Sequence, residues 1–152
     1  MKKKIVIGSD HAGFEMKNFL IDTLIKDGYV VEDKGPFNDS AVDAGVYAIA
    51  VGEEVARHLD GTLGILVCGT GIGMSIMANK VKYIRASLVT DLFSAKMTKA
   101  HNNANVLCIG ARIFAKSMAA EMMDVWLNTE FLGGKYADRV QNIINYEDDH
   151  KK

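Results

Sequence analysis

Residues 63–73 read LGILVCGTGIG, an apolar run that ends in a cysteine and a loop of alternating glycines. The run predicts a buried strand from Leu63 to Val67, because strands covered on both faces carry near-continuous aliphatic residues. The glycines let the backbone turn tightly into a helix, expected from about Gly71 to Lys80. A buried strand that leads through a short loop into a helix is the repeating unit of parallel α/β sheets.

Outward from this stretch, four other short apolar runs alternate with segments of helical pattern. The further predicted strands are residues 3–9, 29–31, 84–89 and 105–109. The further predicted helices are residues 13–26, 43–59 after a capping box at Ser40 and Asp43, 90–101 capped by Thr90 or Asp91, 113–127 and 135–146. Five strands interleaved with helices predict a three-layer α/β/α sandwich around a five-stranded, parallel, Rossmann-like sheet.

Length and composition restrict the class of protein. The chain has 152 residues, of which 49% are hydrophobic and 24% charged, so we expect one domain spanning residues 1–152. A formal net charge of −1 argues against a nucleic-acid partner. No apolar run is long enough for a signal-peptide core or a membrane span, which predicts a cytoplasmic protein without a membrane partner. Two cysteines and no CxxC pair predict neither a disulfide framework nor a structural zinc site.

The most polar loops follow the first and third predicted strands. They are Asp10–Gly13 and Cys68–Gly73. Ligands of open α/β sheets bind beyond the carboxyl ends of the strands, where the strand order reverses. In common five-stranded orders the first and third strands flank that point, so these two loops are the candidate site.

The glycine loop alone is a weak signal. Gly69, Gly71 and Gly73 would let backbone N–H groups approach an oxyanion at the start of a helix. The loop does not match GxGxxG, however, and it lacks the Lys-Ser/Thr ending of a P-loop. A tight strand-to-helix turn without a ligand explains the glycines equally well.

The cysteine at the start of the loop adds a chemical group. Cys68 is placed where a helix begins, an environment that favours a thiolate, whereas Cys108 is expected to be an inert core residue. A thiolate beside backbone amides can remove a proton alpha to a carbonyl, with Thr70 near enough in sequence to assist. Nucleophilic attack by Cys68, with His101 or His11 as its base, remains an alternative.

Several motifs occur together, in one order, over nearly the whole chain. They are Gly8–Phe14, Asp33–Gly35, Cys68–Gly73, Ala78–Lys80, Ile84–Ala86, His101–Asn105 and Gly110–Arg112. In these motifs the chain resembles the ribose-5-phosphate isomerase B and galactose-6-phosphate isomerase family. A subset of that family has a glutamate at the position of Met74, so the resemblance is to the cysteine type.

The resemblance implies a role for each matching residue. Cys68 would be the base that moves a proton between C1 and C2 of a sugar phosphate. His101 would donate a proton to open the cyclic sugar, with Asp10 beside it. The enediolate and sugar oxygens would be held by Gly69, Thr70, Gly71, Ile72, Gly73 and Asn102, and the phosphate by His11, Arg112 and Arg139.

Two departures from the family concern substrate contacts. Many relatives have Asp-Tyr-Pro where this chain has Asp43-Ala44-Gly45, so an aromatic wall of the sugar site is missing. Lys135 replaces a common arginine and loses its bidentate fork. The retained Asp10, His11 and Cys68 favour ribose 5-phosphate as substrate, while a wider pocket leaves allose or galactose 6-phosphate as the alternative.

The resemblance also implies an assembly. We expect a homodimer or a dimer of dimers whose active site is shared between subunits, with Lys135 and Arg139 reaching across from the last helix. No cofactor and no metal are implied, because Cys68, His11 and His101 lack an established zinc spacing. A non-catalytic, flavodoxin-like module that binds phosphate through the same loop is the alternative from another class.

Overall fold

Five strands form the centre of the structure, and their order decides which loops meet. The computed structural model describes residues 2–150. The strands are β1 (Lys4–Ser9), β2 (Val31–Asp33), β3 (Thr62–Cys68), β4 (Ala86–Leu88) and β5 (Val106–Gly110). They lie in the order β2-β1-β3-β5-β4, and every pair is parallel. The predicted five-stranded parallel sheet is therefore confirmed.

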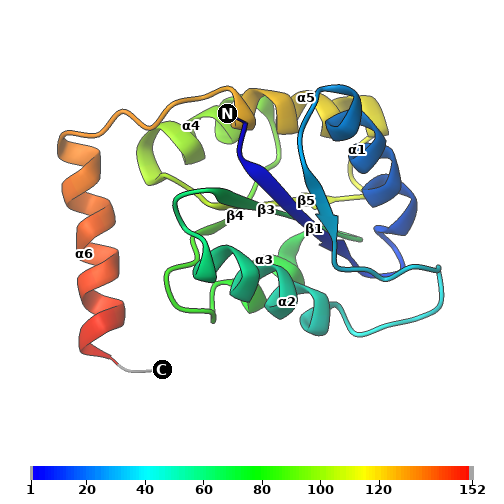
Figure 1. The fold of residues 1–152 in the computed structure, drawn as a ribbon, viewed down its shortest axis with the longest axis horizontal. Coiled ribbons are helices and arrows are strands. Elements are labelled where there is room, and N and C mark those ends of the chain that lie inside the picture. The colour runs from blue at the N-terminus through cyan, green and yellow to red at the C-terminus, as the bar shows by residue number, and fades with distance from the viewer. Residues whose placement is uncertain (1, 151–152) are drawn as a thin grey trace.

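Helices cover both faces of this sheet (Figure 1). They are α1 (Phe14–Lys26), α2 (Ala44–Arg57), α3 (Ile72–Ala78), α4 (Leu92–Asn102), α5 (Lys116–Leu127) and α6 (Lys135–Asp149). One hydrophobic cluster joins the sheet to α1, α4 and α5, and a second joins its other face to α2 and α3. Within residues 2–150, none of the helices combines the length and apolarity needed to span a bilayer.

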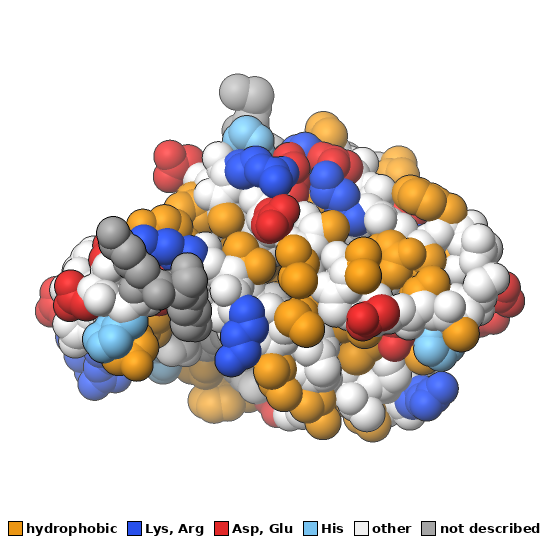
Figure 2. Space-filling view, turned by 90° about the horizontal axis from the view of Figure 1, so that it is seen from below, with side chains coloured by type: hydrophobic (Ala, Val, Ile, Leu, Met, Phe, Trp, Pro, Cys, Tyr) orange, Lys and Arg blue, Asp and Glu red, His pale blue; other side chains and the backbone are white. Residues whose placement is uncertain are grey.

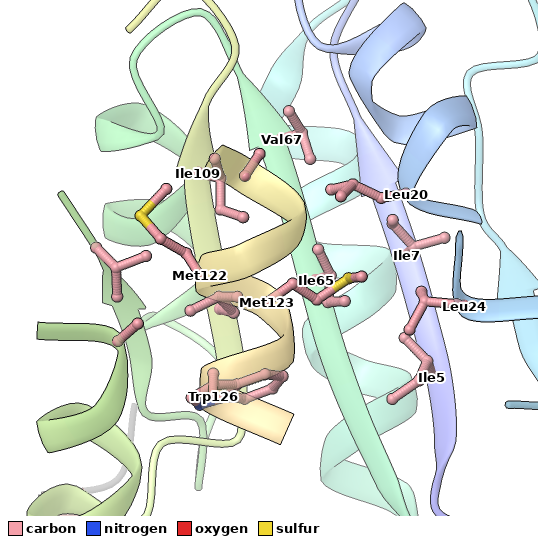
Figure 3. Close-up of a cluster of buried hydrophobic side chains, with 14 of the residues drawn as sticks. Ile5, Ile7, Leu20, Leu24, Ile65, Val67, Ile109, Met122, Met123 and Trp126 are labelled. Carbon is pink, nitrogen blue, oxygen red and sulfur yellow. The ribbon is translucent and has the colours of Figure 1, made fainter. Parts of the chain in front are cut away.

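The alternation of side chains along β1 explains the two clusters. Ile5 and Ile7 point into the first cluster, where Trp126 of α5 is also fully buried (Figure 3). Val6, between them, points into the second cluster together with Val51 of α2. Because successive residues of a strand face opposite sides, a strand buried on both faces must be apolar throughout. The uninterrupted aliphatic runs of the sequence are the signature of this burial.

The last helix stands apart from the three layers (Figure 1). An extended segment leads to it from α5, and the N–H of Leu132 in that segment donates to the carbonyl of Ala100 at 3.0 Å. Gly133 and Gly134 both have positive φ and end the segment. Val140 is the one buried side chain of α6. A helix with so little of its surface covered leaves most of its side chains available for other contacts.

Several predicted boundaries shift in the structure. β2 begins at Val31 rather than Tyr29, because the Tyr29 N–H donates to the carbonyl of Leu24 and closes the end of α1. The predicted Ser40 capping box is wrong, because Asp43 caps α2 alone by accepting from the Gly45 N–H at 2.8 Å. α5 begins three residues later than expected and α6 ends three residues later.

Candidate functional site

The strand order brings three loops to one edge of the sheet. β3 lies between β1 and β5, so the carboxyl ends of these three strands are neighbours. Ser9 is paired with Val67, and Cys68 with Gly110. The loops that follow the strands therefore start side by side. The predicted loops after β1 and β3 are joined by a third, after β5, because β4 occupies the sheet edge.

The loop after β1 holds Asp10 and His11. The Asp10 carboxylate accepts from the N–H of Gly13 at 2.9 Å, which fixes the turn into α1. A β-carbon on Gly13 would lie 2.3 Å from the carbonyl oxygen of Val67, so only glycine allows this close approach to β3. His11 is exposed, and its Nδ1 lies 3.5 Å from the N–H of Val42, which donates to it.

Cys68 ends β3 at the start of the glycine loop. Its side chain is 5% exposed, and Sγ accepts a hydrogen bond from the N–H of Gly71 at 3.1 Å. Gly71 has a φ of 79°, a left-handed conformation that the loop needs in order to aim this N–H at the sulfur. A backbone donor aimed at sulfur stabilises a thiolate more than a thiol, since charge-assisted hydrogen bonds are the stronger kind.

The rest of the glycine loop is open to solvent. The Thr70 hydroxyl is exposed and accepts from the N–H of Ile72 at 3.3 Å. Gly73 is exposed, and a β-carbon built on it would meet no other atom within 4 Å. The N–H groups in the first turn of a helix have no acceptor within the helix. An anionic oxygen at the open face beside Gly73 can accept hydrogen bonds from such groups.

Arg112 lies across the glycine loop from the end of β5. Its backbone N–H donates to the carbonyl of Gly69 at 2.9 Å, and the neighbouring N–H of Ala111 donates to that of Cys68 at 2.8 Å. A β-carbon on Gly69 would lie 3.4 Å from Cδ of Arg112 and 3.6 Å from its Nε and Nη1. The guanidinium thus lies over the loop with its side chain exposed to solvent. A cation at this place favours anions beside the Cys68 loop.

A second group of candidate residues surrounds the end of α4. The ring of His101 stacks on that of Tyr136 at the start of α6, with centroids 4.1 Å apart and planes 6° apart. Lys135 Nζ and the Arg139 guanidinium lie 5.2 and 5.6 Å from the centre of the same tyrosine ring. Asn102, the last residue of α4, is exposed. One aromatic ring therefore gathers an imidazole and two cations.

The two groups lie at opposite ends of the sheet within one chain. α4 ends just before β5 begins, whereas Cys68 is paired with Gly110, the last residue of β5. The five residues of β5, at about 3.3 Å each, separate the end of α4 from the level of Cys68 by roughly 16 Å along the strand. The structure therefore brings Asp10, His11, the Cys68 loop and Arg112 together. It does not bring them to His101, Asn102, Lys135 or Arg139 of the same chain.

Two residues near the candidate site escaped the sequence analysis. Tyr136 gave no signal, since one tyrosine at a helix start is ordinary. Lys17 is fully buried on α1, and its Nζ lies 2.5 Å from the Asp33 carboxylate. Asp33 in turn accepts from the N–H of Gly35 at 2.8 Å, and the Gly35 carbonyl accepts from Ser9 at 3.0 Å. This chain of contacts ties α1 to the strand end that precedes Asp10.

Two of the sequence motifs have a structural explanation. The Asn79 side chain exchanges two hydrogen bonds of 2.8 Å with the backbone of Ala86, and so pins α3 to the edge strand β4. The Asn105 side chain accepts from the Arg85 N–H at 2.8 Å and donates to the carbonyl of Tyr83 at 2.9 Å. These asparagines hold the edge of the sheet and contact neither group of candidate residues through these bonds.

The second cysteine, Cys108, is a core residue, as predicted. Cys108 is fully buried, and burial, with a smaller effect of Cys68, raises the pKa of its thiol well above the ordinary value. Such a thiol stays protonated and unreactive. Within residues 2–150, no group of three or more His, Cys, Asp and Glu side chains is arranged to hold a metal ion.

Known proteins are similar to this chain in both sequence and fold. A sequence model described as Ribose/Galactose Isomerase matches residues 5–143. Ribose-5-phosphate isomerase B of Escherichia coli is 40% identical over 146 residues, which are 95% of this chain and 97% of that protein. D-erythrulose-4-phosphate isomerase of Pectobacterium atrosepticum is 39% identical over 150 residues, 97% of each chain.

The fold agrees with that of solved relatives. The crystal structure of ribose-5-phosphate isomerase B from Mycoplasma genitalium with bound ribulose-5-phosphate has a TM-score of 0.94 and 37% identity, with 97% of each chain covered. The match extends along nearly the whole chain, in sequence and in structure. The chain therefore belongs to the ribose/galactose isomerase family of sugar-phosphate isomerases.

Proposed function

We propose that this protein interconverts ribose 5-phosphate and ribulose 5-phosphate, with Cys68 as the base. The observation that carries the proposal is the hydrogen bond from the Gly71 N–H to the Cys68 sulfur, at the mouth of an open amide loop. It favours a thiolate at the carboxyl edge of the sheet, where ligands of such folds bind. The relatives named for ribose 5-phosphate support the choice of sugar.

The proton transfer follows from the positions of these groups. The thiolate of Cys68 removes the proton from C2 of the open aldose, and the electron pair moves onto the C1 oxygen to give an enediolate. The N–H groups at the open start of α3, beside Gly73, hold the negative oxygen, and the guanidinium of Arg112, which lies over the loop, binds the phosphate. A proton then passes from the C2 hydroxyl to the C1 oxygen, Cys68 returns its own proton to C1, and C2 becomes the carbonyl carbon of the ketose. Aligned donors of this kind contribute roughly 3–4 kcal/mol each to the transition state.

We further propose that the site is completed by a second copy of the chain. The groups assigned to ring opening and phosphate binding, His101 and Arg139, lie about 16 Å along the sheet from Cys68 of their own chain. A partner would supply both, His101 from the end of its α4 and Arg139 from its α6, because α6 stands clear of the body and its Ile143 and Tyr146 are exposed. His11, beside the Cys68 loop, would bind the phosphate from the other side.

An exposed apolar face beside the Cys68 loop supports this assembly. Its side chains come from α2 and α3, and Figure 2 shows hydrophobic side chains gathered over this part of the surface. They are Val46, Ile49, Ile72, Ile76 and Met77. An apolar patch next to a site that lacks some of its residues is the kind of surface that a partner covers.

The proposal is tested with the two cysteines as a matched pair. Cys68→Ala should lower kcat for ribose 5-phosphate by roughly 10²–10⁴-fold, the usual contribution of a general base. The variant should still bind ribulose 5-phosphate in calorimetry. Cys108→Ala should keep its turnover. Equal kcat in Cys68→Ala and wild type would refute the base, and a covalent Cys68–substrate adduct in mass spectrometry would support a thiol hydrolase instead.

A hexose 6-phosphate is the second candidate substrate. Where many relatives carry an aromatic residue, this chain has Ala44 at the start of α2, close to the Val42–His11 contact. A smaller side chain leaves room for another carbon of the sugar. Side-by-side kcat/KM values for ribose 5-phosphate, allose 6-phosphate and galactose 6-phosphate decide between them, and we expect the pentose to be highest. Binding without turnover of any sugar would favour the non-catalytic module.

A further inference from the structure

A cluster of cations surrounds two adjoining cavities at the amino ends of the strands, far from Cys68. The larger cavity, about 420 Å³, is lined by Lys2, Lys3 and Lys99, and the smaller, about 290 Å³, by Lys3, Lys99 and Arg85. Glu130 and Asp60 are the carboxylates in the two linings. The four cations thus exceed the acids by two, in a chain whose net charge is −1.

Lys99 is the buried member of this cluster. It is 7% exposed, and its Nζ donates to the carbonyl of Ala104 at 3.3 Å. Burial, together with the charges of Lys3 and Arg85, lowers the pKa of Lys99 to about 8. No carboxylate is among the groups that shift it. A buried ammonium without a counter-ion is costly, and an anion beside it would offset that cost.

One buried donor without an acceptor lies in the same region. The Arg85 guanidinium is occupied by the carbonyls of Asn102, Asn103 and Tyr83. The indole N–H of Trp126, however, is buried and has no acceptor within residues 2–150. Its ring lies 5.3 Å from Lys99 Nζ, and Figure 3 shows it level with Ile5, at the amino end of β1. Positive charge is therefore in excess in the two linings, and one unpaired donor lies beside Lys99.

The lining also has an apolar side. Tyr29, Leu63, Leu127 and Phe131 complete the larger cavity. The volume lies within the range of small-molecule sites, which combine an apolar wall with a few polar anchors. We infer that this cavity binds an organic phosphate, with its phosphoryl group against Lys3 and Lys99 and its carbon skeleton against the aromatic and leucine side chains. The cavity lies at the opposite end of the sheet from Cys68 of the same chain.

The single tryptophan provides a reporter for this cavity. Adenosine 5′-monophosphate, which has a phosphoryl group and a flat ring system, serves as the probe, with adenosine as the match that lacks phosphate. We expect the monophosphate to change Trp126 fluorescence saturably and adenosine to have no comparable effect.

Three lysine variants test the assignment. Lys99→Met should weaken binding of the monophosphate about tenfold or more. Lys3 is exposed, so Lys3→Met should fold normally, and it should weaken binding severalfold. Lys96→Met is the matched control, since Lys96 is exposed on the same helix and lines neither cavity, and its affinity should equal that of wild type. Equal affinities for wild type and Lys3→Met, or no saturable change up to about 10 mM probe, would overturn the inference.

Discussion

Gly71 and Leu88 are in such close contact that a β-carbon on the glycine would lie 2.5 Å from the leucine Cδ1. The same glycine has a φ of 79° and donates its N–H to the Cys68 sulfur at 3.1 Å. The conformation of the loop, its packing on the edge strand and the donor to the thiol thus depend on one residue without a side chain.

Gly71→Ala should therefore reduce both stability and activity. A left-handed alanine alone costs about 1–3 kcal/mol, and the clash with Leu88 adds to it. We expect a lower free energy of unfolding in urea and a fall in kcat, as the N–H turns away from Cys68. Gly73→Ala is the control for stability, because its β-carbon meets no atom within 4 Å. Two variants of equal stability would contradict this account of the loop.

Mixing two inactive variants tests the shared site. Cys68→Ala and His101→Ala are each expected to lose most activity. If a site combines Cys68 of one chain with His101 of its partner, an equal mixture that exchanges subunits should recover about a quarter of the wild-type sites, since half the dimers are mixed and each has one intact site. If both residues act from one chain, no mixture recovers activity. Unfolding and refolding the two variants together ensures exchange.

Restoring the aromatic wall should narrow the substrate range. Ala44→Tyr places a ring at the first residue of α2, near the backbone that contacts His11. The lost volume should disfavour a sixth carbon, so the ratio of kcat/KM for ribose 5-phosphate over allose 6-phosphate should rise about tenfold, or about 1.4 kcal/mol. An unchanged ratio would show that this segment does not line the sugar.

Lys99 should make stability depend on alkaline pH. Burial, with the charges of Lys3 and Arg85, lowers its pKa to about 8 in the folded protein, against 10.5 ordinarily. Between pH 8 and 10.5 the Lys99 side chain is protonated in the unfolded chain but not in the folded one. The free energy of unfolding of wild type relative to Lys99→Met should therefore rise with pH over this range, by up to about 3 kcal/mol. Below pH 8 Lys99 is charged in both states, and the full cost of burying its charge lowers the stability of the folded protein. Urea unfolding at pH 7 and 10, with Lys96→Met as control, measures this difference.

Much of the fold could be predicted because buried strands appear in the sequence as short aliphatic runs. The aliphatic runs around Ile5, Ile65 and Leu107 were found, and the capping residue Asp91 is confirmed by its bond to the Ser94 N–H at 2.7 Å. Boundaries shifted where backbone contacts outside the local pattern decide them. The Tyr29 N–H, for example, closes α1 instead of joining β2.

The arrangement of the site was less accessible to sequence. The loops after β1 and β3 could be paired from general topology, and the structure places them together. The separation of His101 from Cys68 within one chain follows from the parallel topology, because a helix between two parallel strands runs back to the amino edge. The stacking of His101 on Tyr136 depends instead on where α6 lies, which no local pattern determines. The position of Arg112 over Gly69 depends on β5 lying between β3 and β4 in the sheet. That strand order is set by long-range pairing.

That strand order also imposes a sequence of events on folding during synthesis. β4 pairs with β5 alone, and β5 is made later, so residues 86–88 must wait, unpaired, until residues 106–110 have left the ribosome and docked on β3. Arg112 follows directly behind β5. The nascent chain therefore carries Cys68 and its glycines well before the guanidinium that covers them, and the carboxyl edge is among the last parts of the sheet to take its final form.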